Sequence, residues 1–253
     1  AVATTGAIDI SDDGGNLSVG VVTTDAASAV TLSATGAITD LNGAATNNVT
    51  GASLVATTGA GVNLNTVITA GGTLTATVSG DGDINVRNAS GGALTVTAAT
   101  VTGIGDVNVT NDSTMTVTLA TTVNGDVTLS GTALTLTAIF AGGPGAGDGG
   151  IIATATTGDI LLNGLTAEGD SVTLTAAGAI NQDGDGLTDI VAGSAMLSGA
   201  TGVGIVNGPI QVNLSTLSGR FATGGFFVTD TADGLTVDTV SGVAGVVDTA
   251  LGS

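Results

Sequence analysis

The pattern that decides the fold recurs between residues 82 and 129, as Gly82-Asp83-Ile84-Asn85-Val86, Gly105-Asp106-Val107-Asn108-Val109 and Gly125-Asp126-Val127-Thr128-Leu129. After each Gly-Asp pair an apolar residue alternates with a polar one. Strict alternation is typical of a β-strand with one buried face, and glycine favours the turn before it. The stretch therefore predicts short strands separated by tight turns.

Along residues 8–134, the first apolar residues of such triplets form two interleaved series with steps of 19 to 24 residues. Two series that share one period indicate coils with at least two strand faces each. We therefore predict an all-β parallel β-helix (β-solenoid) with about 21 residues per coil and about a dozen coils. The series are Ile8, Val30, Leu54, Leu74, Leu94, Met115 and Leu134, and Leu17, Ile38, Val62, Ile84, Val107 and Val127.

Residues 1–180 are predicted to form regular coils, and residues 181–253 a continuing solenoid with less regular coils. One coil cannot bury its inward aliphatic side chains alone, but the coils above and below close a narrow core. A helical fold is disfavoured, since Gly and β-branched residues are frequent throughout. The segments Ala1 to Ile10 and Val243 to Ser253 are predicted to be ordinary coil without a cap, so we expect neighbouring solenoid segments or a second copy to cover the ends.

The formal net charge is −19, and the only basic side chains are Arg87 and Arg220. A surface of this sign repels phosphate backbones and anionic lipid, so we expect no nucleic-acid partner. No apolar run approaches the ~20 residues of a membrane helix, so membrane insertion is not expected.

The chain begins with neither Met nor a leader peptide, and we expect a mature or excised piece of an exported protein.

Catalysis is not expected from this composition. Solenoid lyases need basic side chains, and the chain has no His or Lys. A pair of carboxylates could still serve a glycosidase, but most aspartates stand beside glycine in turns, and Glu168 is the only glutamate.

Three segments resemble the repeats of filamentous-haemagglutinin-like bacterial exoproteins: Thr35-Gly36-Ala37-Ile38-Thr39-Asp40, Ser171-Val172-Thr173-Leu174-Thr175-Ala176-Ala177-Gly178-Ala179-Ile180 and Gly193-Ser194-Ala195-Met196-Leu197-Ser198-Gly199-Ala200-Thr201-Gly202-Val203-Gly204. The resemblance implies a right-handed parallel β-helix that is exported and acts in adhesion, biofilm or surface layers. The chain lacks a secretion-domain motif and an outer-membrane barrel segment, so no export route is implied.

We therefore expect an extracellular structural or adhesive module of a bacterial surface protein, able to stack end to end into a filament or surface layer. The alternative is a polysaccharide-binding or polysaccharide-cleaving β-helix. The expected partners are further copies, neighbouring segments of the same protein and surface glycans.

The sharpest local motif is a candidate calcium loop formed by Asn181, Asp183, Asp185 and Asp189. These oxygen ligands match positions one, three, five and nine of an EF-hand-type loop, with Gly186 at position six. Position twelve is Ala192, so the bidentate glutamate is missing. The alternative is a solvated Asp/Gly turn, and the same alternatives apply to the weaker motif Gly80-Asp81-Gly82-Asp83.

Two further features have both a structural and a functional interpretation. Thr-x-Thr pairs such as Thr95/Thr97 and Thr135/Thr137 fit outward strand positions, or an ice-ordering face if they align. The phenylalanines Phe221, Phe226 and Phe227 fit fillers of a wider coil, or an aromatic groove for a carbohydrate.

Overall fold

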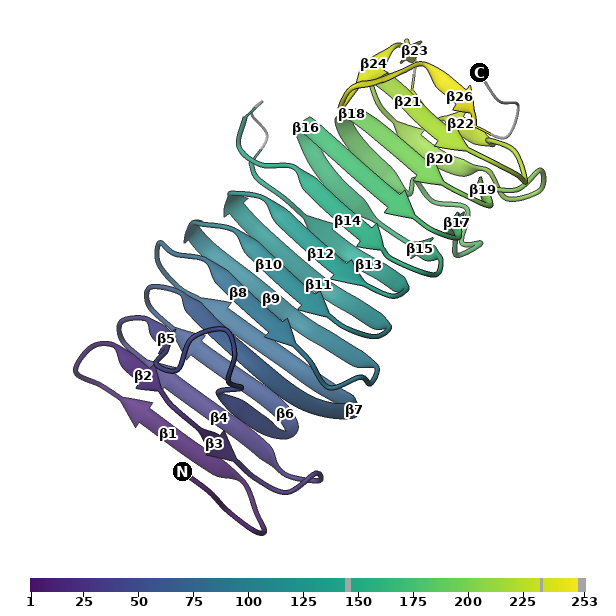
Figure 1. Cartoon of the computed structure of the whole chain (residues 1–253). Coiled ribbons are helices and arrows are strands. Elements are labelled where there is room, and N and C mark those ends of the chain that lie inside the picture. The colour runs from purple at the N-terminus through teal and green to yellow at the C-terminus, as the bar shows by residue number, and fades with distance from the viewer. Residues whose placement is uncertain (144–146, 233, 250–253) are drawn as a thin grey trace.

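A computed structural model, which describes residues 1–143, 147–232 and 234–249, confirms the predicted fold class. The chain is an all-β parallel β-solenoid of about 10 turns, with stacked coils roughly 22 residues apart. The described termini lie at opposite ends of the rod (Figure 1). The prediction of about a dozen coils was too high, because segments such as 41–48, 183–189 and 238–245 leave the regular coil path.

The described chain contains only strands and their connections, and none of it forms a helix that could cross a membrane. The strands are β1 Ile8–Asp12, β2 Leu17–Val19, β3 Val22–Thr23, β4 Ala29–Ala34, β5 Ile38–Asp40, β6 Val49–Thr58, β7 Val62–Val78, β8 Ile84–Asn88, β9 Leu94–Ile104, β10 Val107–Asn111, β11 Met115–Asn124, β12 Val127–Gly131, β13 Leu134–Phe140, β14 Ile151–Ala155, β15 Ile160–Leu162, β16 Leu165–Ala176, β17 Ala179–Gln182, β18 Ile190–Gly199, β19 Gly202–Val203, β20 Ile210–Asn213, β21 Thr216–Phe221, β22 Val228–Asp230, β23 Thr236–Val237, β24 Thr239–Val240, β25 Val243–Ala244 and β26 Val246–Asp248.

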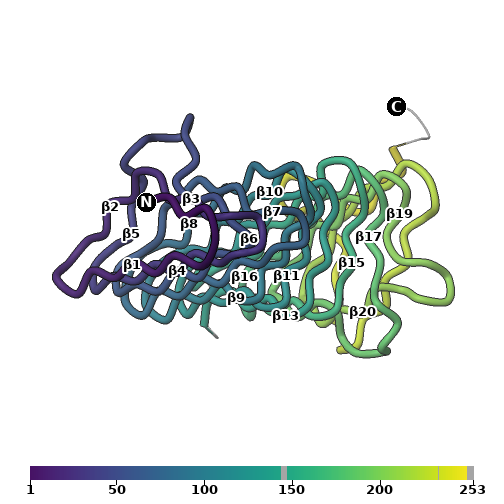
Figure 2. Tube along the Cα trace, turned by 90° about the horizontal axis from the view of Figure 1, so that it is seen from below, coloured from purple at the N-terminus to yellow at the C-terminus, as the bar shows by residue number. Residues whose placement is uncertain are grey.

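Strands of successive coils pair in parallel, so that equivalent residues lie above one another. One ladder contains β2, β5, the start of β7, β8, β10, β12, β14, the second half of β16, the second half of β18 and β21. A second ladder begins with β1, β4, β6, β7, β9, β11 and β13. Pairing continues across residue 180 through β15, β17 and β19. Figure 2 shows the stacked coils from another side, with the loop between β5 and β6 projecting from the rod.

The core is one continuous file of small aliphatic side chains inside the coils. It extends from Ile8 to Leu217 and includes the stacked residues Ile84, Val107 and Val127. These are the apolar positions that the alternating triplets predict to point inward. Each coil is thin, so its side chains are buried mainly by the coils on either side.

The Gly-Asp pairs mark one corner of the solenoid, where the backbones of adjacent coils approach closely. Gly105 and Gly125 both have φ values of 156°, a conformation that L-residues with a side chain rarely adopt. A Cβ atom on Gly105 would lie 2.3 Å from the Gly82 carbonyl oxygen, and one on Gly125 would lie 2.2 Å from the Gly105 oxygen. Only glycine fits the repeated corner.

The aspartate after each corner glycine connects one coil to the next. Oδ1 of Asp83 accepts a hydrogen bond from the Asp106 N–H at 2.9 Å, and Oδ1 of Asp106 accepts one from the Asp126 N–H at 2.8 Å. Asp126 repeats the contact with the Gly150 N–H at 2.7 Å. We call Asp83, Asp106 and Asp126 the corner aspartate row. Much of the regular spacing of acidic residues therefore has a structural cause.

At one inward corner the core is polar, a feature that the apolar triplets do not predict. Asn88 and Asn111 are buried, and the Asn88 Nδ2 donates to the Asn111 Oδ1 at 2.8 Å. The Asn88 Oδ1 accepts from the Ile68 N–H and the Thr66 hydroxyl, while the Asn111 Nδ2 donates to the Thr114 carbonyl. These amides satisfy backbone groups that a narrow aliphatic core would leave unpaired.

The C-terminal segment differs from the predicted ordinary coil between Val243 and Ser253. Strands β24 and β25 form an antiparallel hairpin, and the Val240 carbonyl accepts a hydrogen bond from the Ser218 hydroxyl of β21. Val240 and Val243 bury the outward-pointing Met196 of β18. The hairpin thus covers an apolar residue of the outer face, whereas Ile152 in the same row stays 44% exposed. Residues 250–253 lie outside the described residues.

Substitution of the corner glycine tests this account. Gly105→Ala is expected to lower the free energy of unfolding by roughly 3 kcal/mol, because the added methyl group meets a carbonyl oxygen of the adjacent coil. Urea denaturation of the variant and the wild type measures the difference. Gly20→Ala is the matched control, since its Cβ would meet no atom closer than 3.8 Å. Equal losses in the two variants would contradict the close approach at the corner.

Candidate functional site

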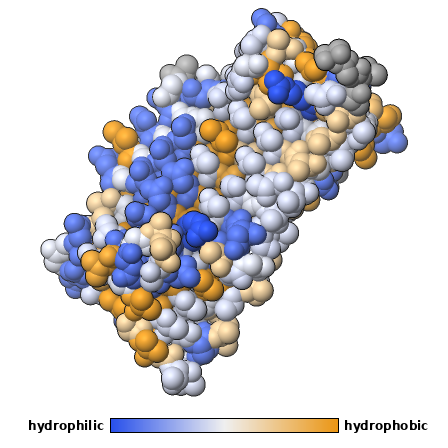
Figure 3. Space-filling view, in the orientation of Figure 1, coloured by the Kyte–Doolittle hydropathy of each residue, from blue (hydrophilic) through white to orange (hydrophobic). Residues whose placement is uncertain are grey.

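A hollow on the outer surface lies across β7, β8 and β10. Two outward rows line it: Asn63, Asn85 and Asn108 in one, and Asn65, Arg87 and Thr110 in the other. Parallel pairing in register stacks the members of each row at the strand spacing of about 4.8 Å. Figure 3 shows hydrophilic side chains gathered over β8 and β10 on this face.

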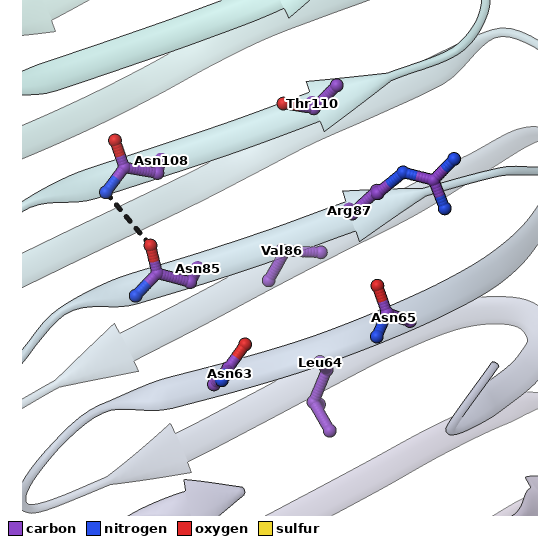
Figure 4. A pocket seen from close by; sticks show the side chains of 8 residues that line it. All are labelled: Asn63, Leu64, Asn65, Asn85, Val86, Arg87, Asn108 and Thr110. Atoms are coloured by element: carbon purple, nitrogen blue, oxygen red, sulfur yellow. Dashed lines mark hydrogen bonds between the residues drawn. The ribbon is translucent and has the colours of Figure 1, made fainter. Parts of the chain in front are cut away.

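The hollow has a volume of about 190 Å³ and is lined mainly by amides, a hydroxyl and a guanidinium group. The Asn108 Nδ2 donates to the Asn85 Oδ1 at 3.0 Å, and Figure 4 shows these amides in line along the face. The Arg87 side chain is exposed, and its guanidinium group makes no hydrogen bond or ion pair with any residue that the structure describes. The hollow therefore offers free donors to a ligand.

The carboxylate of Asp40 is connected to this hollow through Asn65, and its own oxygens are occupied. They accept hydrogen bonds from the side-chain amides of Asn48 at 2.8 Å and Asn65 at 3.0 Å, and from the N–H groups of Asn42 and Gly43. The bond from Asn48 is the main reason that the pKa of Asp40 lies below its ordinary value. Asp40 thus holds Asn65 in place at the rim of the hollow.

The predicted calcium ligands lie on β17 and the turn that follows it. Asn181 pairs with Leu161 in the ladder. Asp183 accepts from the Asn163 side chain and from the Asp185 N–H, and Asp185 accepts from the Leu187 N–H at 2.7 Å. These bonds shape the turn, as in the alternative interpretation of a plain Asp/Gly turn.

Asp189 differs from the other carboxylates of this loop because it is buried. Its Oδ2 accepts from the Gln211 N–H at 2.7 Å, while its Oδ1 is buried without a hydrogen-bond partner. Burial raises the pKa of Asp189 to about 6, and the charges of Asp185 and Asp183 act in the same direction. A buried and incompletely paired carboxylate is costly when ionised.

No group of three or more His, Cys, Asp or Glu side chains within residues 1–143, 147–232 and 234–249 is arranged to hold a metal ion. Calcium at Asn181, Asp183, Asp185 and Asp189 therefore remains a prediction from residue spacing. In the weaker motif, Asp81 and Asp83 each accept an N–H from the next coil, which gives them a structural role.

The threonine pairs do not form one uninterrupted face. Thr95 pairs with Thr73, but the register shifts between Leu74 and Thr75, so the next threonine of β7 faces Ala98 instead.

The phenylalanines Phe221, Phe226 and Phe227 lie in the last coils. Phe226 packs against the core, and its ring centroid lies 6.3 Å from that of Phe221.

The hollow at Arg87 was not predicted as a site. One signal for it is present in the sequence, since asparagine occupies the equivalent outward position in three successive coils, at Asn63, Asn85 and Asn108. Outward strand positions are usually treated as solvent-exposed fillers, and the alignment of Arg87 with these amides depends on the register.

No protein-family model matches the chain, and neither does any curated protein or solved structure. The resemblance to filamentous-haemagglutinin-like exoproteins thus stands on the quoted repeats alone.

The buried carboxylate predicts a specific pH dependence. Because the pKa of Asp189 rises from 3.8 to about 6 on folding, the folded state binds the proton more tightly than the unfolded state. The free energy of unfolding should fall as pH rises from about 4 to about 6, by at most about 3 kcal/mol. Asp189→Asn, which keeps an acceptor for Gln211, should be more stable than the wild type at pH 7, and the gain should disappear below about pH 4.

Urea denaturation across this pH range measures the effect, with Asp185→Asn as the control from the exposed part of the same loop. A pH profile that is the same in wild type and Asp189→Asn would contradict the assignment.

Thermal unfolding with calcium or with a chelator tests the calcium prediction. Binding to the folded loop should raise the unfolding temperature. Asp189→Asn should remove the increase, because it takes away the buried carboxylate ligand. Superimposable curves for the wild type would refute calcium binding at this loop.

Proposed function

We propose that this chain is a structural and adhesive rod segment of a bacterial surface protein, acting outside the cell without catalysis. The observation that carries the proposal is the continuous parallel ladder, whose coils hold the described termini at opposite ends of a rod (Figure 1). About ten coils at the strand spacing give a length of roughly 48 Å. Such a rod separates whatever is attached at its two ends and presents the rows of outward side chains between them.

Self-association is part of this proposal, with a second copy or a neighbouring segment covering the coil ends. In the last coil, Val246 continues the inward file of Leu197 and Gly219, yet it is 40% exposed. An open strand edge with exposed apolar residues is a template for further pairing. The acidic residues of the two ends repel each other, so salt should favour stacking.

Polysaccharide binding is the second candidate, and the hollow at Arg87 favours it. Amide and hydroxyl groups pair with sugar hydroxyls, and they line the hollow in two rows. Cleavage is not proposed at this place, because β8 and β10 contain no Asp or Glu to act as acid and base.

Electron microscopy and light scattering of the purified chain at low and high salt test the proposed role. We expect elongated particles that associate end to end as salt and protein concentration rise. Val246→Lys should suppress association, because it places a charge on the open core. Val247→Lys is the matched control, since Val247 continues the outward row of Arg220 and is equally exposed.

Compact particles would refute the rod. Particles that stay monomeric at every salt and protein concentration would refute end-to-end stacking.

A further inference from the structure

The two arginines of the chain, 133 residues apart in sequence, lie in one straight row on one face of the solenoid. Each residue of this row pairs in register with the next, from β8 to β21. We call it the arginine row. Its members are Arg87, Thr110, Ser130, Thr154, Thr175, Ser198 and Arg220.

Six coil steps separate the two guanidinium groups, which corresponds to roughly 29 Å along the rod at the strand spacing. Every residue between them carries a hydroxyl group. The neighbouring outward row carries Asn85, Asn108 and Thr128 over the first three of these coils. The face thus presents polar groups at a regular spacing between two cations.

The strands that carry this row are less acidic than the rest of a chain with net charge −19. None of the strand segments that carry the arginine row contains an aspartate or glutamate: 84–88, 107–111, 127–131, 151–155, 171–176, 194–199 and 216–221. The corner aspartate row lies four residues away along the strand, or about 13 Å. That separation exceeds the Debye length of about 8 Å at physiological ionic strength, so solvent ions screen the charges of the corner aspartates. Asp112, two residues after Thr110, and Asp248, which follows the Val247 that pairs with Arg220, lie nearer to the ends of the row.

Each arginine also lines a hollow and lacks a partner. The hollow at Arg87 has a volume of about 190 Å³, and the one at Arg220, which Ser198 also lines, about 140 Å³. Neither guanidinium forms an ion pair or hydrogen bond with the described part of the chain. At the first hollow, Asn65 is only 8% exposed, and Figure 4 shows its side-chain oxygen directed toward the strand of Arg87.

We infer that the arginine row binds an extended polysaccharide that carries carboxylate groups, lying parallel to the rod axis. A guanidinium group binds a carboxylate through two parallel hydrogen bonds. The hydroxyl and amide groups between the arginines pair with sugar hydroxyls. This inference rests on the proposed adhesive role and names its ligand class, a uronate-containing glycan, and its surface.

Other ligands fit the row less well. Double-helical nucleic acid carries one negative charge per about 1.7 Å, a much higher density than one carboxylate per sugar, so the acidic remainder of the surface would repel it more strongly. A neutral glycan would leave both guanidinium groups without an ionic partner. A second copy would bring another net charge of −19 against the face.

Binding of purified oligogalacturonate to the intact chain, measured by calorimetry, tests the inference. An oligomer long enough to span both arginines should bind, and Arg87→Gln or Arg220→Gln should each weaken binding about tenfold or more, since each removes a charge-assisted contact. The double variant, with both Arg87→Gln and Arg220→Gln, should show no measurable binding of oligogalacturonate. A short oligomer should bind more weakly than the long one, because it reaches one arginine at a time.

Three comparisons complete the test. Thr116→Ala, on the exposed side of β11 in the other ladder, is the control and should bind as the wild type does. A neutral glucan of equal length should bind much more weakly than oligogalacturonate. The melting temperature of each arginine variant should match that of the wild type, because both side chains are exposed.

Absence of binding by the wild type, unchanged binding by the double variant, or equal binding of the neutral glucan would each overturn the inference. These results would leave the rod itself intact, since microscopy measures its shape independently. Compact particles in microscopy would instead refute the proposed function.

Discussion

Hydrogen bonding between the backbones of successive coils is the constraint on which the rest of this structure depends. Strands that pair in parallel at about 4.8 Å place each side chain directly above its equivalent in the coil below. Inward positions then form continuous files, and outward positions form continuous rows. The corner at Gly105 and Gly125 has no room for a side chain because the coils approach so closely there. The corner aspartates add side-chain bonds across the same gap.

The sequence was sufficient to predict the class of fold and most of the core. Alternation at positions such as Ile84, Val107 and Val127 identified the inward residues, because burial of one strand face leaves a period of two. The buried amides of Asn88 and Asn111 were not predicted, since asparagine at a strand end also fits a turn. The C-terminal hairpin was missed because Val240 and Val243 contact Met196 from far along the chain, and local patterns do not encode such a contact.

The candidate surface illustrates why a site on a solenoid is difficult to predict from sequence. Arg87 and Arg220 are far apart in the chain, and they share a row only because each intervening coil preserves the register despite its different length. Loop insertions change the length of a coil without shifting its strands. The calcium loop shows the reverse case, since Asp183 and Asp189 are close in sequence, but one shapes an exposed turn and the other is buried.

The hairpin over Met196 has a consequence for chemical durability. Met115 lies in the core and Met196 beneath the hairpin, with exposed fractions of 1% and 8%. The chain contains no Cys, Trp, Tyr or His, so these two thioethers are its most readily oxidised side chains, and both are shielded from solvent. Oxidants that convert accessible methionine to its sulfoxide would find little to attack. A rod of this composition should keep its packing in oxidising surroundings, where an exposed sulfur or indole would be damaged.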